Sequence, residues 1–183
     1  NEQIDLISAN EHNGKILLDD GVRNNHPVWS PNGEKFAYLS TKGNDYFGQT
    51  DLYVYSFDDS ESLKLVPGVF SAPVWLDENS LIFSMKSAPN KNGSKYYDLY
   101  LYSLDDEKKE PKRLTYNRRL TSPSIDYISN KIAAVGISDG TSNIYIANLY
   151  LNPIRLDNDK KYDKINFNQL TEYENGDKVF SLS

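Results

Sequence analysis

Residues 27–40 read Pro-Val-Trp-Ser-Pro-Asn-Gly-Glu-Lys-Phe-Ala-Tyr-Leu-Ser, and related stretches follow twice along the chain. The second copy, at residues 73–84, reads Pro-Val-Trp-Leu-Asp-Glu-Asn-Ser-Leu-Ile-Phe-Ser. A weaker third copy, at residues 123–135, reads Pro-Ser-Ile-Asp-Tyr-Ile-Ser-Asn-Lys-Ile-Ala-Ala-Val. Each copy joins two apolar runs through a polar turn, as two strands of a hairpin do. A repeat spaced by roughly 40–50 residues indicates an array of similar structural units.

Two further elements follow each copy. The first is a strand-like apolar run, which begins Asp-Leu-Tyr at residues 51 and 98 and Asn-Ile-Tyr at residue 143. The second is a short closing segment at Leu65-Val66, Leu114-Thr115 and Leu170-Thr171. Residues 3–7 and 16–18 match these two elements of an earlier unit, and residues 179–183 match the head of a later one. Each unit is therefore predicted to contain four short strands, which is typical of a propeller blade.

The predicted fold class is all-β: a β-propeller of four-stranded blades, partial or open, with about four blades' worth of chain. A lone four-stranded sheet leaves apolar faces exposed, and sheets packed around an axis bury them. We expect one propeller region over residues 1–183. Its predicted parts are a partial blade at 1–22, blades at 23–68, 69–117 and 118–173, and the start of another at 174–183. A fragment of a larger ring is favoured over a small ring whose two ends share a blade.

Composition narrows the functional classes. The 183 residues carry 20 Lys and Arg against 26 Asp and Glu, a net charge of −6 that argues against non-specific nucleic-acid binding. The lack of cysteine excludes disulfides, thiolate nucleophiles and cysteine-ligated zinc. The sequence contains no run of about 18 apolar residues, so no membrane span is predicted. The chain begins with Asn1 rather than Met, so its start does not exclude secretion.

The segment at residues 27–37 resembles the repeat of the TolB-like propellers, a family similar in layout to WD-repeat propellers. Asp51-Leu52-Tyr53, Arg113-Leu114-Thr115 and Gln169-Leu170-Thr171 match later parts of that repeat. The resemblance covers nearly the whole chain and is loosest in the third unit, where Ile125 replaces the tryptophan. It implies a non-catalytic scaffold for protein–protein interaction in a bacterial cell envelope or periplasm. Similar repeats form gating propellers of prolyl-oligopeptidase-like and tricorn-like proteases, so the alternative is an accessory substrate-gating domain of a larger peptidase or hydrolase.

We predict no catalytic, cofactor-binding or metal-binding residues. Residues 136–140 match the G-x-S-x-G nucleophile elbow, but a strand rather than a helix is expected after them, and neither His12 nor His26 lies in a family motif. Asp139-Gly140 is therefore interpreted as a hairpin turn. The acidic or amide residues that start the third strands are interpreted as hydrogen-bond acceptors for backbone turns rather than cation ligands.

The repeated aromatic residues are predicted to be core residues, because each blade needs the same contact. This applies to the tryptophans at 29 and 75 and to the tyrosines at 53, 100 and 145. A basic cluster at residues 108–109, 112–113 and 118–119 could steer an acidic partner, although a solvated surface is the simpler interpretation.

The long loops carry the candidate partner-binding residues, because aromatic side chains on loops of a rigid scaffold suit a protein interface. These residues are Tyr46, Phe47, Tyr96, Tyr97 and Tyr150. The expected partners are proteins or other domains of a larger chain, with no nucleic acid.

Overall fold

The chain forms β-strands and connecting turns in the computed structural model, which describes residues 2–7, 15–19, 21–44, 48–149, 165–174 and 176–179. These residues contain no helix, which confirms the all-β prediction for the described part of the chain. It follows that no helix among them could cross a membrane. The chain divides into two compact units, Asn1–Val69 and Phe70–Ser183, and each is described by itself.

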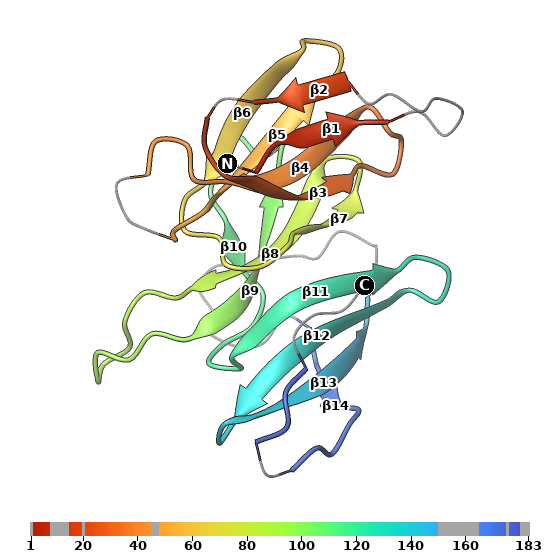
Figure 1. Ribbon diagram of the computed structural model, residues 1–183. Helices are drawn as coiled ribbons and strands as arrows, with labels where there is room; N and C mark the ends of the chain where they lie inside the picture. Colours follow the sequence, from red (N-terminus) through yellow and green to blue (C-terminus); the bar gives the residue numbers. More distant parts are fainter. Residues whose placement is uncertain are drawn as a thin grey trace. The chain divides into compact units, whose positions relative to one another are not determined.

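The first unit holds a two-stranded and a four-stranded antiparallel sheet (Figure 1). The smaller sheet pairs β1 (Ile4–Leu6) with β2 (Lys15–Leu18). The larger sheet contains, in spatial order, β3 (Asn24–Trp29), β4 (Lys35–Ser40), β5 (Asp51–Ser56) and β6 (Glu61–Val66). Sequence neighbours are also neighbours in the sheet, as expected for a meander of four strands.

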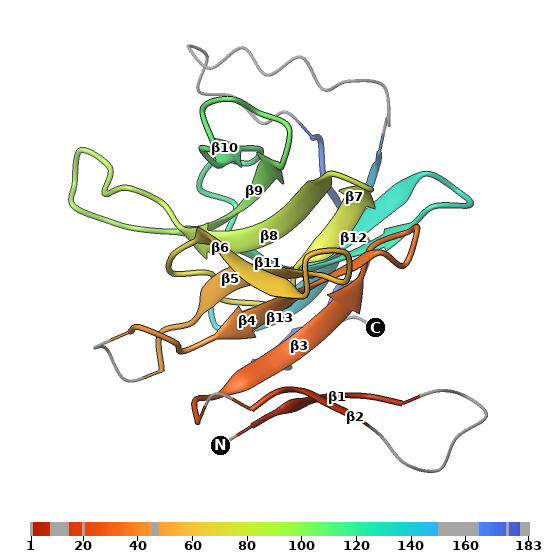
Figure 2. The ribbon, with the colours of Figure 1, turned by 90° about the horizontal axis from the view of Figure 1, so that it is seen from above.

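The second unit repeats this layout in two four-stranded sheets. One contains β7 (Val74–Asp77), β8 (Ser80–Lys86), β9 (Tyr97–Ser103) and β10 (Lys112–Arg113), which run side by side in Figure 2. The other contains β11 (Leu120–Asp126), β12 (Lys131–Ser138), β13 (Thr141–Asn148) and β14 (Asn168–Gln169). The fourth strands end just before the predicted closing segments. The amides of Leu114 and Leu170 nevertheless continue the ladder at 2.8 and 2.7 Å to the Leu99 and Ile144 carbonyls.

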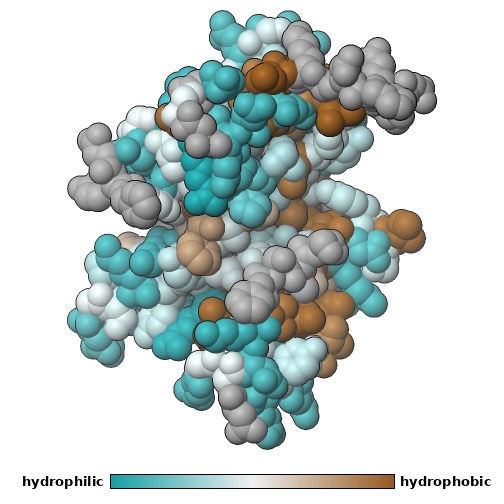
Figure 3. All heavy atoms as spheres, in the orientation of Figure 1, coloured by the Kyte–Doolittle hydropathy of each residue, from teal (hydrophilic) through white to brown (hydrophobic). Residues whose placement is uncertain are grey.

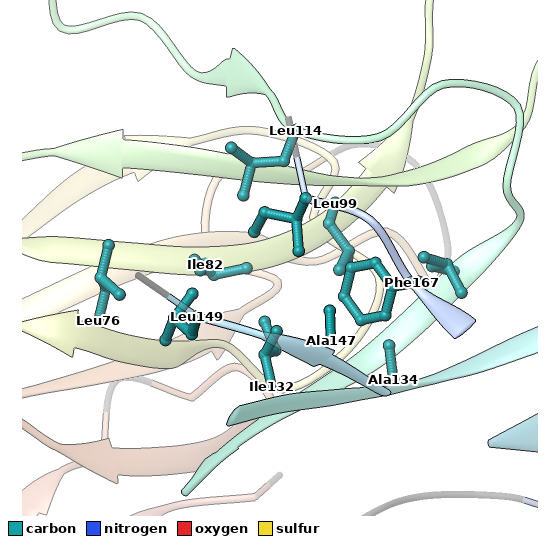
Figure 4. Packing of buried hydrophobic residues seen from close by; sticks show 11 residues of the cluster. Leu76, Ile82, Leu99, Leu114, Ile132, Ala134, Ala147, Leu149 and Phe167 are labelled. Atoms are coloured by element: carbon teal, nitrogen blue, oxygen red, sulfur yellow. The ribbon is translucent and has the colours of Figure 1, made fainter. Parts of the chain in front are cut away.

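The two sheets of the second unit share an apolar core. Figure 4 shows aliphatic side chains of β8, β9 and their neighbours facing those of β12 and β13, with Phe167 among them. The packing follows from the two-residue period of a strand, which points Ile82 of one sheet and Ile132 of the other toward the same interior. Both side chains are fully buried. Polar contacts join the sheets as well: Tyr127 Oη donates to the Trp75 carbonyl, and the Ser122 amide donates to Ser71 Oγ at 2.9 Å.

The core of the first unit is built on aromatic rings. Phe36 and Tyr38 of β4 lie directly opposite Tyr55 and Tyr53 of β5. Their ring centroids are 5.2 and 5.5 Å apart, in stacked orientations. Cross-strand aromatic pairs of this kind stabilise a sheet. Ile4 of β1 is buried against the same cluster, so the small sheet covers this face of the large one.

The turn between β12 and β13 has two residues, Asp139 and Gly140, with φ angles of 50° and 81°. Two successive positive φ values define the turn geometry that matches the twist of a hairpin, and an Asp-Gly pair adopts it readily. The G-x-S-x-G match is therefore part of a hairpin, as the sequence predicted.

An acidic or amide side chain at the start of each third strand fastens the chain that leaves the fourth strand. In the second sheet, buried Asp98 accepts hydrogen bonds from Thr115 Oγ1 at 3.1 Å and from the Asn117 and Arg118 amides at 3.0 Å. The Arg113 guanidinium pairs with the same carboxylate. We call this arrangement the Asp98 clamp. It confirms the interpretation that these positions accept hydrogen bonds from turns.

The equivalent positions in the other two large sheets also accept hydrogen bonds, but from different partners. Asp51 accepts a hydrogen bond from the Gly68 amide at 3.0 Å and pairs with the Lys64 ammonium. Asn143 accepts from Thr171 Oγ1 at 2.9 Å and from the Tyr173 amide at 2.8 Å. The repeat of Asp or Asn in the sequence is thus a repeat of one structural contact.

The carboxyl group of Asp51 makes the stability of the first unit depend on pH. Burial tends to raise the pKa of this carboxyl group, but hydrogen bonds from Lys64, Asn44 and the Gly68 amide together hold the pKa below its usual value. A group with a depressed folded-state pKa stabilises the protein above its unfolded pKa, and this contribution is lost as the pH falls toward the folded pKa.

We therefore expect the free energy of unfolding to fall below about pH 5 with a steeper slope in the wild type than in Asp51→Asn. Urea denaturation followed by tryptophan fluorescence between about pH 3 and pH 7 measures this slope. Asp58→Asn, which removes an exposed carboxylate in the β5–β6 turn, is the matched control. Equal slopes in the two variants would contradict the prediction.

Candidate functional site

The second unit contains a partly open hollow of about 390 Å³. Its described lining comes from segments that are far apart in sequence. The connection from β10 to β11 contributes residues 117–120, the β12–β13 hairpin contributes residues 137–139, and Tyr96 stands just before β9. Tyr145 and Phe167 also line the hollow. We call this feature the arginine hollow, after Arg118 and Arg119.

The backbone that carries the two arginines is held in place by the Asp98 clamp. The carboxylate of Asp98 takes the amide hydrogens of Asn117 and Arg118, so this connection is tied to β9. Asn117 and Arg119 have φ angles of 59° and 55°. Asparagine tolerates this left-handed conformation, whereas for arginine it costs about 1–2 kcal/mol. The buried clamp compensates this cost and presents two adjacent cationic side chains at one rim.

Tyr96 forms an aromatic wall beside the arginines. The Arg119 guanidinium carbon lies 5.2 Å from the centroid of the Tyr96 ring, a cation–π contact. The tyrosine backbone is fixed, because Ser87 and Tyr96 exchange hydrogen bonds at 2.8 and 3.2 Å across the base of their loop. The ring and the guanidinium are thus presented from ordered backbone on two different connections.

The opposite wall belongs to the last sheet. The Tyr145 hydroxyl donates to Gln169 Oε1 at 3.1 Å, and its ring lies directly over Gly136. Ile137, 42% exposed, and Asp139 stand at the end of the hairpin. The part of the lining that the structure describes therefore includes two cations, one carboxylate and apolar or aromatic surface.

The structure allows two of the five predicted partner-binding residues to be placed. Tyr96 lines the arginine hollow, and Tyr97 is the first residue of β9. Adjacent residues at a strand point to opposite faces, so Tyr97 packs instead against Phe70, with ring centroids 4.3 Å apart, beside Lys86. Tyr46, Phe47 and Tyr150 lie outside the described residues. Partner binding by these five residues stays a prediction.

The basic cluster suggested by the sequence is divided among different partners. Lys112 pairs with Asp106 and Arg113 with Asp98, so both charges are compensated within the sheet. Arg118 and Arg119 line the hollow. Sequence reasoning identified these two arginines but missed Tyr145, Ile137 and Asp139 as their neighbours, because the strands between them pair only in the folded chain.

The prediction that both repeat tryptophans are core residues is half wrong. Trp75 is 1% exposed, whereas Trp29 is 53% exposed. Trp29 sits at the end of β3, where its ring stacks on Phe57 at 5.5 Å and meets the edge of Phe36. The same repeat position is therefore covered in one sheet and half open in another. Of the three tyrosines predicted to be core residues, Tyr53 and Tyr100 are buried, whereas Tyr145 is partly buried and lines the hollow.

Hydrophilic residues make up most of the described surface on the face shown in Figure 3, and apolar residues form separate patches there. The apolar patches on this face are separate, whereas a hydrophobic interface would be indicated by one broad apolar area. Among the described residues, no group of three or more His, Asp or Glu side chains is arranged to hold a metal ion.

Solved structures share this fold. A protein described as TolB, from Agrobacterium tumefaciens, superposes with a TM-score of 0.65 at 14% identity, over 91% of this chain and 55% of that one. Oligopeptidase B from Leishmania major matches with a TM-score of 0.56 at 13% identity, over 90% of this chain and 24% of that one. A prolyl endopeptidase structure matches with a TM-score of 0.56 at 18% identity, over 78% and 22%.

These matches establish the fold class: the chain is built from blades of the TolB-like β-propeller type, as the repeat predicted. The chain spans about half the length of the TolB protein and about a quarter of each peptidase. No protein-family model matches the sequence, and no curated protein matches it. The blade boundaries at residues 22, 68, 117 and 173 stay predictions.

Proposed function

We propose that this chain is a non-catalytic β-propeller scaffold that binds a protein partner, in a bacterial cell envelope or periplasm. The observation that carries the proposal is the arginine hollow, in which Tyr96, Arg118 and Arg119 are presented from backbone that is held by hydrogen bonds. A preorganised site of this kind binds without the entropic cost of ordering loops. Tyrosine and arginine are also the residues that most often dominate protein interfaces. The TolB-like fold supports the cellular setting.

The chemistry of the hollow supports binding rather than catalysis. Ser138 lies 3.4 Å from Asp139 through their side-chain oxygens, on an exposed turn. A serine nucleophile needs a general base such as histidine within hydrogen-bond reach, and the described lining includes no histidine. The hollow instead offers charge and ring surface, which suit recognition.

We expect Tyr96→Ser to reduce the recovery of a specific partner on the order of tenfold, because a central interface aromatic contributes about 2 kcal/mol or more. The measurement is quantitative affinity capture with the full-length protein as bait. Tyr173→Ser is the matched control, since Tyr173 is 45% exposed and lies outside the hollow's lining. Undiminished capture by Tyr96→Ser, or equal losses in both variants, would contradict the hollow as the binding site.

The second candidate function is an accessory propeller that gates substrate access in a larger peptidase or hydrolase. The likeness to oligopeptidase B and to a prolyl endopeptidase favours it, because this chain covers only 24% and 22% of those proteins. Reading the full-length gene discriminates between the two. A hydrolase domain in the same gene would support gating, and a gene that encodes no hydrolase domain would support the scaffold.

A further inference from the structure

The arginine hollow has the features of a site for a carboxylate, and this step rests on the proposed function. The chain carries a net charge of −6, yet two arginines are adjacent at this rim. Arg119 makes no ion pair with any carboxylate in the part of the chain that the structure describes. Its guanidinium rests instead against the Tyr96 ring. A cation held beside an aromatic face keeps its N–H edge available for an anion.

The backbone that carries this guanidinium is held by hydrogen bonds at Asn117, Arg118 and Arg119. The Asp98 clamp fixes the amides of Asn117 and Arg118, and the Ser87–Tyr96 pair fixes the backbone of the tyrosine whose ring the guanidinium contacts. A guanidinium binds a carboxylate through two parallel N–H···O bonds, and this geometry discriminates a carboxylate from a neutral amide. A guanidinium presented from this backbone therefore favours a planar carboxylate over other acceptors.

The remaining lining narrows the ligand further. Ile137 offers exposed apolar surface at the same rim, so an apolar residue beside the acidic group would find a contact. Asp139 stands at the hairpin end of the hollow and repels a second negative charge. The lining thus suits one carboxylate next to an apolar side chain, and it disfavours a run of acidic residues.

We propose that the arginine hollow binds a peptide segment of the partner through one carboxylate group, with an apolar side chain beside it, and that Arg119 is the residue that contacts the carboxylate. Two sources provide this chemistry: an acidic side chain within a chain, or a C-terminal carboxylate. Arg118 lines the same hollow.

The test uses three peptide probes on the full chain. Acetyl-Phe-Glu-Ser-amide carries a side-chain carboxylate, acetyl-Phe-Gln-Ser-amide is its neutral isostere, and acetyl-Phe-Gln-Ser with a free C-terminus carries a terminal carboxylate. Amide chemical shifts in ¹H–¹⁵N spectra locate binding and yield Kd. We expect shifts at Arg118, Arg119 and Asp139 with at least one acidic probe, and a Kd roughly tenfold weaker for the neutral probe. Equal binding of all three, or no shifts at the hollow, would overturn the proposal.

Three variants sharpen the result. Arg119→Gly removes the guanidinium while its backbone readily adopts the left-handed φ of 55°, so the variant should keep its melting temperature and lose the preference for acidic probes. Asp139→Asn removes the repelling charge and should tighten binding of the acidic probes about twofold or more. Tyr173→Ser should leave the Kd of the acidic probes and of the neutral probe unchanged. Retained preference for acidic probes in Arg119→Gly would overturn the role of Arg119.

Failure of this proposal is distinguishable from failure of the proposed function. If Tyr96→Ser loses the partner and Arg119→Gly retains it, the hollow binds a partner but not through a carboxylate. If both variants retain the partner, the hollow is not the binding site.

Discussion

Asp98→Ala is expected to lower the free energy of unfolding of the second unit by about 3–5 kcal/mol. Asp98 is fully buried, and its carboxylate interacts with four donors. These are the Arg113 guanidinium, the Thr115 hydroxyl and two backbone amides. Alanine leaves a largely buried cation and several donors without an acceptor. The cost of unmet buried groups exceeds the net value of the bonds that they had formed.

Urea denaturation followed by tryptophan fluorescence measures this loss. The chain has two tryptophans, and only Trp75 lies in the second unit. In a Trp29→Phe background the signal therefore reports on Trp75, which is 1% exposed. The background change is mild, because Trp29 is half exposed.

Asn143→Ala is the matched control for this prediction. Asn143 occupies the same repeat position and accepts from Thr171 and the Tyr173 amide, without an ion pair. Its removal should cost about 1–3 kcal/mol. Asp98→Asn keeps an acceptor oxygen and should fall between the wild type and Asp98→Ala. If Asp98→Ala lowers the free energy of unfolding no more than Asn143→Ala does, the ion pair with Arg113 adds nothing to the stability of the clamp.

Gly136→Ala is expected to destabilise the last sheet by about 1–3 kcal/mol through overpacking. A Cβ atom at Gly136 would stand 2.4 and 2.6 Å from two ring carbons of Tyr145 and 3.1 Å from a methyl group of Leu120. These separations are shorter than van der Waals contact, so the ring must move. The ring is held by the hydrogen bond from its hydroxyl to Gln169 and by the strand pairing of β12 with β13.

A double-mutant cycle isolates this clash from the general effect of alanine in a strand. With Tyr145→Ser in the background, the obstructing ring is gone, and Gly136→Ala should cost less than about 0.5 kcal/mol. The same urea denaturation measures both. A cost that is unchanged in the Tyr145→Ser background would contradict the steric explanation. In the wild type, the absence of a side chain at Gly136 thus leaves room for the Tyr145 ring, which lines the hollow.

The strand order and the turns were predictable because their causes are local. Asp139-Gly140 adopts its turn from the φ preferences of two residues, and β4 and β8 are short continuous runs of buried residues, as expected for strands that are covered on both faces. The repeat supplied the rest, since a third-strand Asp or Asn recurs with a closing segment that follows it. The clamp at Asp98 was predictable in kind, as an acceptor for a turn, but its four partners were not.

The environment of individual aromatic residues was not predictable from their repeat position. Trp29 and Trp75 share a motif and differ from 53% to 1% in exposure. Burial depends on what covers a side chain, and the residues that provide the cover are distant in sequence. Tyr96 and Tyr97 illustrate the same limit, because adjacent rings end on opposite faces with different neighbours.

The sequence by itself determined the blade as the building unit, because short apolar runs and turn preferences act over a few residues and recur with the repeat. The tertiary structure alone decided that Tyr96, Arg119 and Asp139 surround one hollow. These residues belong to three connections, and only the pairing of strands and the packing of two sheets bring them together. Long-range packing sets such distances, and no local pattern in the chain encodes them.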